Sequence, residues 1–551
     1  MRRLHVDGAG AVRRPHPALR LADDPVGGHQ RPDVHAQAVG GEVGGEGRSP
    51  GAGDGLAAAA DLLGDDDVAG GEPVVERAAE PDDGDGAAEG QPGGAPGAVA
   101  DGRGGRPGEP APDGAGLQPQ RRAHDQAGRL VTGHPPSAAR GGPQIQFRAA
   151  RGGAPPYDSF MRSISTAERR ARLVRRHRLA AEARTDDVPE IARSLVVLHA
   201  TDPATVYLSV AARSVAAGPA DVERALYDDR TLLRMLAMRR TMFVAPIDLV
   251  PALQASTANA LAAKQRRRYS TMIERGSDLT DVPAWFRKVE DAAHRALLAR
   301  GEATGAQLSA AVPELRTQVD PAPGKAYSRP TGVTTWVLVT LGCEGLIVRG
   351  RPNGGWTSSQ YRWAPIESWL PGGIERVPAD EARAEVVRRW LRAFGPAPAA
   401  DLKWWTGWTA GEVGKALALV DTAEVDLGGA TGLVLADDLE PAPPAEPSAA
   451  LLPALDPTPM GWQDRGWFLG DHGELLFDRN GNIGPTIWWD GRIVGGWGQR
   501  KDGEIAFRLL EDAGADAAKA VAREAERIAA WYGDVRAIPR FRTPLERELT
   551  A

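Results

Sequence analysis

The stretch that decides the fold is TLLRMLAMRRTMFVAP, residues 231–246, in which β-branched and other apolar residues alternate around Arg239 and Arg240. Alternation with a period of two is typical of a half-buried β-strand. The stretch therefore predicts a small hairpin with the two arginines in its middle.

Helical segments precede this hairpin. Residues 165–180, STAERRARLVRRHRLA, open with Ser165 followed three residues later by Glu168, which is a capping-box arrangement. Residues 188–201 and 206–217 predict two more helices, separated at Asp202-Pro203, and a short one follows at 219–229. Three helices followed by a small hairpin are typical of a winged helix, which we place at residues 161–246.

Two further units follow the same order. Residues 247–280 form a connecting segment whose long helix ends in KQRRRY. Residues 281–366 predict helices and a hairpin that turns at Asn353-Gly354-Gly355. Residues 377–440 repeat the theme, since LRAFGPAPAADLKWW (391–405) aligns with LLARGEATGAQLSAA (297–311) in helix end, glycine turn and next helix. The sequence thus predicts three tandem winged helices.

The last part of the chain has strand character. A proline-rich stretch, LEPAPPAEPSAA at 439–450, predicts a linker or loop. Apolar and polar residues then alternate around Asp490-Gly491, a strong hairpin signal, and a helical segment follows at 516–533. We expect a small antiparallel sheet or barrel with a terminal helix at 448–551, which makes the fold class α+β.

Residues 1–160 differ in composition from the rest of the chain. Residues 1–144 lack Lys, Asn, Trp, Tyr, Phe, Ile and Cys. A segment without aromatic residues or isoleucine buries too little apolar area to offset the entropy of ordering it. We expect residues 1–160 to be a disordered extension or a mis-called start, with Met161 as the first residue of the folded protein.

Charge and residue counts narrow the functional classes. The chain has 66 Lys+Arg and 73 Asp+Glu, of which residues 1–160 hold 16 and 23, so residues 161–551 hold 50 of each. A neutral folded part binds nucleic acid only through segregated charge. Cys343 is the only cysteine and the histidines of 161–551 are scattered, so we expect no disulfide, no metal site and no organic cofactor. No apolar run reaches membrane-spanning length, and we expect a cytoplasmic protein.

Several segments together resemble the AlkZ/YcaQ family of winged-helix DNA glycosylases. They are LVVLHATDPATVYLSVAAR (195–213), MLAMRRTMFVAP (235–246), RAFGPAPAADLKWWTG (392–407), LLPALDPTPMGWQDR (451–465) and NGNIGPTIWWDGRIVGGW (480–497). The resemblance covers essentially all of 161–551. It implies three winged helices plus a C-terminal β-barrel around a channel for double-stranded DNA, and it implies excision of alkylated purines.

The active site of the resembled family is a Gln-apolar-Gln or Gln-apolar-Asp triplet just before an Asp-Pro step. This chain has His199-Ala200-Thr201 in that place, so both polar positions differ. Hydrolysis of an N-glycosidic bond passes through an oxocarbenium-like state and needs an attacking water. A neutral His199 would accept a proton from that water with a pKa near the working range, and Thr201 would hold the water. Asp202 is the nearest carboxylate. The alternatives are a structural role for His199 and a helix cap for Asp202.

Basic residues on two predicted elements supply the expected DNA surface. The first hairpin carries Arg239 and Arg240. The connecting helix carries Lys264, Arg266, Arg267 and Arg268, where a solvated helical face is the alternative.

Further candidates lie on the second hairpin and near the end of the chain. Arg349, Arg351 and Trp356 would form a basic wing suited to a minor groove, although Trp356 would equally suit a core. Arg465, Asn482, Trp497, Gln499 and Arg500 match positions that the resembled family keeps polar or aromatic beside its DNA, and Asn482 would also suit a turn. Trp404, Trp405 and Trp408 are expected in a core.

We therefore expect a monomeric DNA glycosylase of base excision repair. It would be a hydrolase that removes alkylated or bulky purine adducts from double-stranded DNA, associated with the nucleoid. The departure at His199 and Thr201 keeps an alternative open, a catalytically inactive DNA-binding protein that acts as a lesion sensor or transcriptional regulator. Three units in one chain suit a lesion channel better than a dimer on half-sites.

Overall fold

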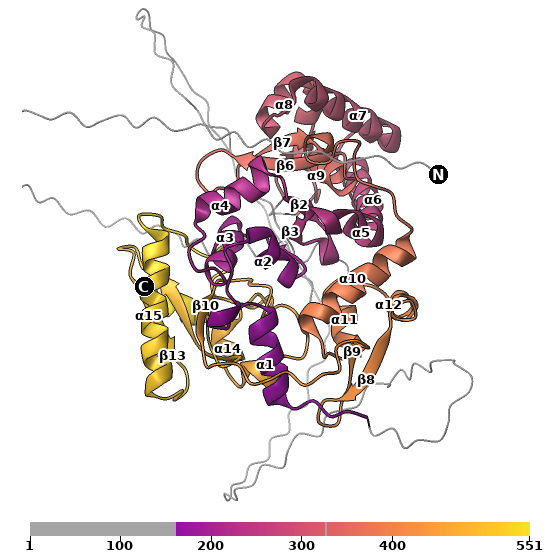
Figure 1. Cartoon of the computed structure of the whole chain (residues 1–551). Coiled ribbons are helices and arrows are strands. Elements are labelled where there is room, and N and C mark those ends of the chain that lie inside the picture. Colours follow the sequence, from indigo (N-terminus) through magenta and orange to yellow (C-terminus); the bar gives the residue numbers. More distant parts are fainter. Residues whose placement is uncertain (1–160, 326–327) are drawn as a thin grey trace, which may run out of the picture. The chain divides into compact units, whose positions relative to one another are not determined.

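Three segments of the chain share one order of elements, in which helices precede a two-stranded hairpin (Figure 1). The computed structural model describes residues 161–325 and 328–551, so the expectation for residues 1–160 lies outside the described residues. The first segment contains α2 (Val188–Ser194), β1 (Leu198–His199), α3 (Pro203–Ala211), α4 (Pro219–Glu223), β2 (Leu232–Leu236) and β3 (Met242–Pro246). Its strands form an antiparallel sheet in the order β1-β3-β2.

The second and third segments repeat this order. The second contains α7 (Val282–Arg300), α8 (Gly305–Ala311), β4 (Gln318–Val319), β5 (Thr331–Gly332), α9 (Thr334–Cys343), β6 (Ile347–Pro352) and β7 (Tyr361–Pro365). The third contains α10 (Ala379–Phe394), α11 (Ala399–Thr406), α12 (Ala410–Leu417), β8 (Thr422–Asp426) and β9 (Thr431–Leu435).

A backbone bridge marks the equivalent place in each segment. Ala303, between α7 and α8, pairs antiparallel with Trp363 of β7, and Ala397, between α10 and α11, pairs antiparallel with Leu433 of β9. In the first segment β1 pairs in the same way with β3. Ala303 and Ala397 occupy the same position of the aligned stretches 297–311 and 391–405, so the pairing supports the alignment made from the sequence.

Two helical connections complete the N-terminal part. α1 (Thr166–Arg176) is capped at its N-terminus by Ser165, whose hydroxyl accepts a hydrogen bond from the Glu168 N–H at 3.2 Å. The expected connecting helix consists of α5 (Val250–Leu253), a π-helical turn at Gln254–Ala258 and α6 (Asn259–Gly276). α6 carries the basic run KQRRRY, as the sequence predicted.

The C-terminal part is an open sheet, which corrects the expected barrel. The strands β10 (Ala449–Leu452), β11 (Thr486–Trp489), β12 (Arg492–Gln499) and β13 (Ile505–Leu509) pair antiparallel in sequence order. Among the described residues β10 and β13 do not pair with each other, so the sheet does not close. α15 (Ala515–Tyr532) packs along both edge strands instead, and α13 (Gly466–Leu469), α14 (Gly473–Leu476) and α16 (Pro544–Leu549) complete this part.

The β1-β3-β2 sheet separates two hydrophobic cores. Leu198, Val244 and Leu236 belong to a core shared with α6, α7, α9 and α15. Phe243 and Met235 belong to a second core, shared with α10 and the C-terminal sheet. Because side chains alternate between the two faces of a strand, neighbouring residues of β1 face different cores.

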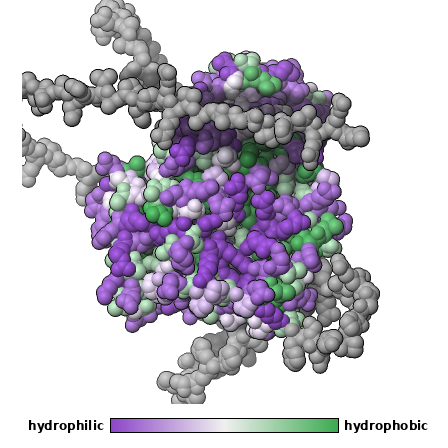
Figure 2. Space-filling model, in the orientation of Figure 1, coloured by the Kyte–Doolittle hydropathy of each residue, from purple (hydrophilic) through white to green (hydrophobic). Residues whose placement is uncertain are grey.

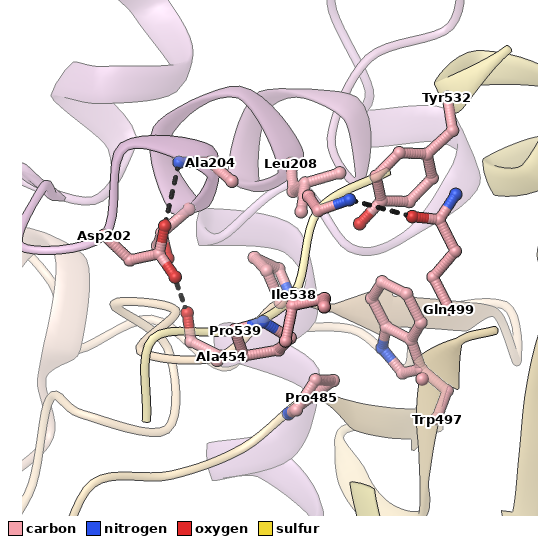
Figure 3. A pocket seen from close by; sticks show the side chains of 14 residues that line it. Asp202, Ala204, Leu208, Ala454, Pro485, Trp497, Gln499, Tyr532, Ile538 and Pro539 are labelled. Atoms are coloured by element: carbon pink, nitrogen blue, oxygen red, sulfur yellow. Dashed lines mark hydrogen bonds between the residues drawn. The ribbon is translucent and has the colours of Figure 1, made fainter. Parts of the chain in front are cut away.

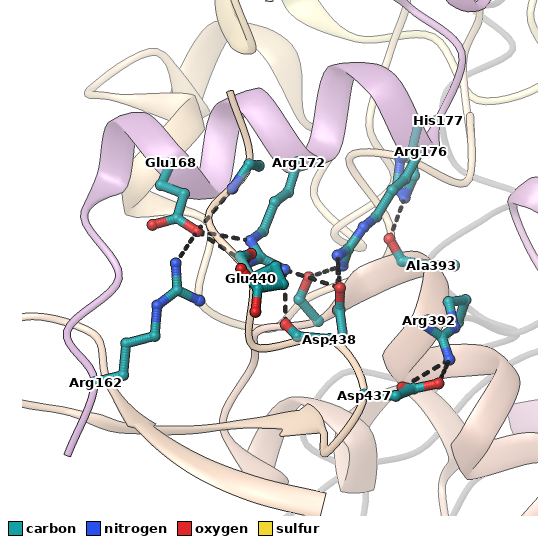
Figure 4. Close-up of polar contacts among 12 residues, drawn as sticks. Arg162, Glu168, Arg172, Arg176, His177, Arg392, Ala393, Asp437, Asp438 and Glu440 are labelled. Carbon is teal, nitrogen blue, oxygen red and sulfur yellow. Dashed lines mark hydrogen bonds and ion pairs between the residues drawn. The ribbon is translucent and has the colours of Figure 1, made fainter. Parts of the chain in front are cut away.

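Helix α1 is strongly basic, but its arginines serve internal contacts (Figure 4). Arg172 and Arg176 both pair with Asp438, at 3.1 and 2.6 Å, and Arg172 also pairs with Glu168 at 2.9 Å. Nη2 of Arg175 donates to the carbonyl of Pro444 at 2.5 Å. The proline-rich stretch after β9 is therefore held along α1 by guanidinium groups.

The face of the molecule drawn in Figure 2 is mainly hydrophilic, with hydrophobic residues in small separate groups. Within residues 161–325 and 328–551, none of the helices combines the length and the apolar character that a membrane span requires.

Candidate active site and nucleic-acid interface

Strand β1 ends at His199, and Thr201 follows two residues later just beyond the strand. β1 pairs with β3, Leu198 opposite Val244 and His199 opposite Phe243, and the pairing continues where the Ala200 N–H donates to the Met242 carbonyl at 2.8 Å. The sequence had predicted one helix over 188–201, but α2 ends at Ser194. The short strand β1 follows, and the His199 triplet therefore begins in an edge strand of the sheet.

The two side chains are buried and keep polar atoms without partners. His199 is 4% exposed and Thr201 is 6% exposed. Neither Nδ1 of His199 nor Oγ1 of Thr201 has a hydrogen-bond partner in the described part of the chain. The His199 ring meets the edge of Phe243 at 5.6 Å. Because buried polar atoms are normally satisfied, these two suit a water or a substrate atom.

His199 is a neutral imidazole at physiological pH. Burial lowers its pKa to about 3, the positive charge of Arg239 acts in the same direction, and Asp456 opposes it. The pKa therefore lies well below the working range that the sequence suggested. A neutral ring still accepts a hydrogen bond and orients a water, but it is a weak base.

Asp202 caps α3 and fastens the chain after α15. Its Oδ1 accepts from the Ala204 N–H at 3.1 Å, as the cap interpretation predicted, and its Oδ2 accepts from the Arg540 N–H at 2.9 Å. Burial raises the pKa of this carboxyl, while the hydrogen bonds from Arg540 and Ala204 lower it. Both oxygens are thus occupied by backbone donors.

Asp202 lines a pocket together with two other residues that the sequence singled out, Trp497 and Gln499 (Figure 3). Nε1 of Trp497 donates to the Leu452 carbonyl at 2.9 Å. Nε2 of Gln499 donates to the Val535 carbonyl at 3.1 Å and its Oε1 accepts from the Ala537 N–H at 3.0 Å. The polar ends of both side chains therefore hold backbone segments together.

The turn of the first hairpin is basic and strained. Arg239 and Arg240 both have positive φ, 53° and 60°, which L-residues rarely adopt. The guanidinium of Arg239 lies 4.2 Å from the ring centre of Trp404, and that of Arg465 lies 5.0 Å from the same ring. Two candidates far apart in the sequence thus meet at one indole, and Arg239 also acts electrostatically on His199.

Arg240 and Arg268 form a pair of like charges. Burial lowers the pKa of Arg268, and the charge of Arg240 lowers it further, which indicates that the two lie near each other. In the described part of the chain neither guanidinium makes an ion pair or a side-chain hydrogen bond. On α6, Lys264 lies four residues before Arg268 and three before Arg267, and both Lys264 and Arg267 are exposed. We call Arg240, Lys264, Arg267 and Arg268 the basic edge.

Two other candidate arginines form ion pairs with acidic side chains. Arg266 pairs with Glu290 at 3.0 Å and with Glu344 at 2.5 Å. Arg351 pairs with Glu223 at 2.5 Å and with Asp228 at 2.9 Å, and it stacks on Tyr227.

Arg349 and Arg500 also contact neighbours of their own. The Arg349 guanidinium lies 5.2 Å from the Trp363 ring centre. Arg500 pairs with Glu504 at 2.5 Å, and its Nε donates to the Leu549 carbonyl at 3.0 Å.

Two further candidate residues, Trp356 and Asn482, are buried and contact other residues of the protein. Trp356 is 7% exposed and packs on Tyr207 and Trp531, with ring centres 5.3 and 5.5 Å away, which agrees with the core alternative. Asn482 is fully buried in a turn, where its Nδ2 donates to Asp478 Oδ2 at 3.0 Å.

Trp404 and Asp456 belong to this region, although neither was predicted from the sequence as a site residue. Trp404 packs partly buried against a core, as expected, and its ring also lies under the guanidinium groups of Arg239 and Arg465. Asp456 is buried beside His199 and forms an ion pair with Arg213 at 2.7 Å. The only signal for Asp456 was its place in LDPTP, a stretch with the same Asp-Pro step as the His199 triplet.

No cluster of three or more His, Cys, Asp or Glu side chains with metal-binding geometry occurs in residues 161–325 and 328–551.

A family model and a solved structure both relate this chain to the DNA glycosylase AlkZ. A family model described as DNA glycosylase AlkZ-like matches residues 192–531. Among solved structures, the DNA glycosylase AlkZ of Streptomyces sahachiroi superposes with a TM-score of 0.53 and 20% sequence identity, covering 68% of this chain and 99% of that chain. At this identity the likeness concerns the fold. No curated protein matches the chain.

Proposed function

We propose, from the premise that this chain belongs to the AlkZ-like DNA glycosylase family, that it hydrolyses the N-glycosidic bond of alkylated purines in double-stranded DNA. The observation that carries the proposal is the pair of unsatisfied polar atoms at β1, Nδ1 of His199 and Oγ1 of Thr201. They stand at the positions where the family resemblance implies the catalytic triplet.

The DNA would lie along the basic edge and the first hairpin. We interpret the three repeated segments as winged helices, because each has helices, a bridge and a two-stranded hairpin in that order. Arg240 and Arg268 stand close together without acidic partners, and such an arrangement suits a phosphate, which would relieve their repulsion. The positive φ of Arg239 and Arg240 is the kind of strain that concentrates at functional sites.

The chemistry follows from a neutral His199. A water held between His199 Nδ1 and Thr201 Oγ1 would attack C1′ of the damaged nucleotide as the bond from C1′ to N9 breaks. The electron pair of that bond passes to the purine ring, which is cationic when alkylated at N7 and therefore leaves neutral. The water proton passes to His199 or to solvent once the new C–O bond forms. With a pKa of about 3, the main contribution of His199 is to hold and orient the water.

A second function is favoured by one specific observation. Arg239 acts on His199 with a positive charge, and a cation beside the sugar opposes an oxocarbenium-like state. With that charge beside the sugar, the site would bind damaged DNA without cleaving it. The protein would then serve as a lesion sensor.

Single-turnover excision from a duplex with one N7-methylguanine tests the proposal. We expect His199→Ala to lower the rate at least about 10-fold with unchanged affinity for the duplex, because an orienting contact is lost. Thr201→Val, which keeps the shape and removes the hydroxyl, should lower it less.

The matched control is His472→Ala, which removes a histidine that pairs with Glu511 away from β1. It should excise at the wild-type rate. Equal rates for His199→Ala, Thr201→Val and wild type would assign the chemistry to other residues and reject the proposal.

A further inference from the structure

Arg234 is a buried cation without a compensating carboxylate. It lies in β2 opposite Val244, and it is 4% exposed. Its Nε and Nη1 have no hydrogen-bond partner, and in the described part of the chain no carboxylate lies within ion-pair distance of it. Burying an unpaired charge costs free energy, so a neighbouring group or a bound ion should compensate the charge of Arg234.

Three tyrosines surround this guanidinium. Burial lowers the pKa of Arg234, but its interactions with Tyr361, Tyr227 and Tyr207 raise it above the usual range, so Arg234 stays charged. The Tyr361 ring centre lies 5.0 Å from the guanidinium carbon. The hydroxyls of Tyr207 and Tyr361 are buried and without hydrogen-bond partners, and that of Tyr227 interacts with the Arg234 guanidinium.

The tyrosines do not supply the missing negative charge. A phenol with its usual pKa of about 10 is uncharged at neutral pH, and burial raises the pKa of Tyr207 and Tyr361 further. Glu223, whose charge acts on Tyr207, is paired with Arg351 at 2.5 Å. Asp202, whose charge acts on Tyr361, accepts from two backbone N–H groups. Both carboxylates are thus engaged by other partners, and Arg234 stays charged.

Arg234 also lines a small pocket between the first and second segments. Arg349 lines the same pocket, and its other walls include the apolar side chains of Met242, Val339 and Ile347. Two guanidinium groups therefore face one space whose remaining walls are mostly apolar. Such walls favour an ion that loses its hydration shell easily, and they disfavour a phosphate, which carries more charge and needs more donors.

We propose that this pocket binds a small monovalent inorganic anion of the chloride class at Arg234. The unpartnered N–H groups of Arg234 donate to the ion, and the ion neutralises the buried charge. Because β2 belongs to the first segment and β6 and β7 belong to the second, the ion stabilises the contact between the hairpin that carries the basic turn and the unit next to it.

Thermal unfolding of the whole chain tests the site. Sodium chloride replaces sodium gluconate at constant ionic strength, because gluconate is too large for the pocket. A ligand that binds only the folded state raises Tm in a saturating way, and we expect a rise of about 2 °C. Arg234→Met should abolish the rise, whereas Arg295→Met, on the exposed face of α7, should keep it.

A second variant and a second method keep the proposal open to refutation if Arg234→Met does not fold. Arg349→Gln keeps Arg234 and removes the second positive charge that lines the pocket, and it should shift the chloride dependence to higher concentrations. Crystals soaked in sodium bromide should give an anomalous peak beside Arg234. The proposal would be overturned if the wild-type Tm does not change with chloride concentration, or if the pocket binds inorganic phosphate but no bromide.

Discussion

Replacing Asp456 by Asn tests the ion pair that joins α3 to the chain after β10. Oδ1 of Asp456 accepts from Arg213 Nη2 at 2.7 Å and Oδ2 accepts from Nη1 at 2.8 Å, and both side chains are 0% exposed. Asp456 also accepts from the Ser209 hydroxyl at 2.8 Å and from the Thr458 N–H at 3.0 Å. Burial raises the pKa of Asp456, but Arg213 outweighs it and holds the pKa below the usual value.

The size of the effect follows from this geometry. Asn keeps the shape of Asp but removes its charge, so the fully buried Arg213 keeps a positive charge without a partner. Breaking a buried pair in this way lowers the free energy of unfolding by about 3–5 kcal/mol. At about 2–4 °C per kcal/mol, Tm should fall by roughly 6–20 °C.

The pair also predicts the direction of a pH effect. A carboxyl whose folded pKa is lowered stabilises the protein above its unfolded pKa, about 3.9, and this contribution disappears as the pH falls through the folded pKa. The difference between Asp456→Asn and wild type should therefore be full at pH 7 and should shrink below about pH 4.

Urea unfolding followed by tryptophan fluorescence measures the effect at pH 7. Asp437→Asn is the matched control, because Asp437 pairs with Arg392 at 2.6 Å but is 69% exposed. Exposed pairs contribute about 0–1 kcal/mol. If Asp456→Asn unfolds within 1 kcal/mol of wild type at pH 7, as an approximate threshold, the pair does not hold α3 and the reasoning is refuted.

Further predictions concern DNA binding, packing and pH. Arg240→Gln and Arg268→Gln should each reduce the slope of log K against log salt by about 0.9, because the proposed complex gives each of them a phosphate contact. Arg351→Gln should not, since its charge is already paired, and equal slopes for all three would remove the basic edge from the interface. Trp356→Ala should destabilise the fold by about 3–5 kcal/mol in urea unfolding, and a stable variant that binds DNA weakly would instead make Trp356 a DNA contact. Single-turnover excision should not vary between pH 5 and 9 through His199, whose pKa is about 3; a rise centred near pH 6.5 would contradict that environment.

Local signals in the sequence were sufficient for much of the fold. The alternation in 231–246 predicted a hairpin, and β2 and β3 flank a turn that contains Arg239 and Arg240. Asp490-Gly491 predicted a second hairpin, and both residues take positive φ between β11 and β12. Such features depend on residues close together in the chain, which is why composition and spacing reveal them.

The structural features that the sequence did not predict depend on contacts between residues far apart in the chain. β1 exists because it pairs with β3, more than forty residues later, so the apolar run 195–200 was interpreted as part of a helix. The expected barrel remained open because α15 covers both edge strands.

The candidate site depended on the same kind of distant contact. The basic character of Arg266 was visible in the sequence, but Glu290 and Glu344, which neutralise it, are far from it in the chain. The pKa of His199 depends on burial and on Arg239, so the sequence alone suggested a value near neutrality.

The most direct test of the central claim is the yield of abasic sites. The full wild-type chain, in excess over a duplex with one N7-methylguanine, is incubated at pH 7, and alkaline cleavage counts the abasic sites, with the undamaged duplex as control. The account predicts that the damaged strand is converted to abasic product well beyond spontaneous depurination while the undamaged duplex stays intact. Tight binding of the damaged duplex without abasic sites above the spontaneous level would contradict it and would make the protein a lesion sensor.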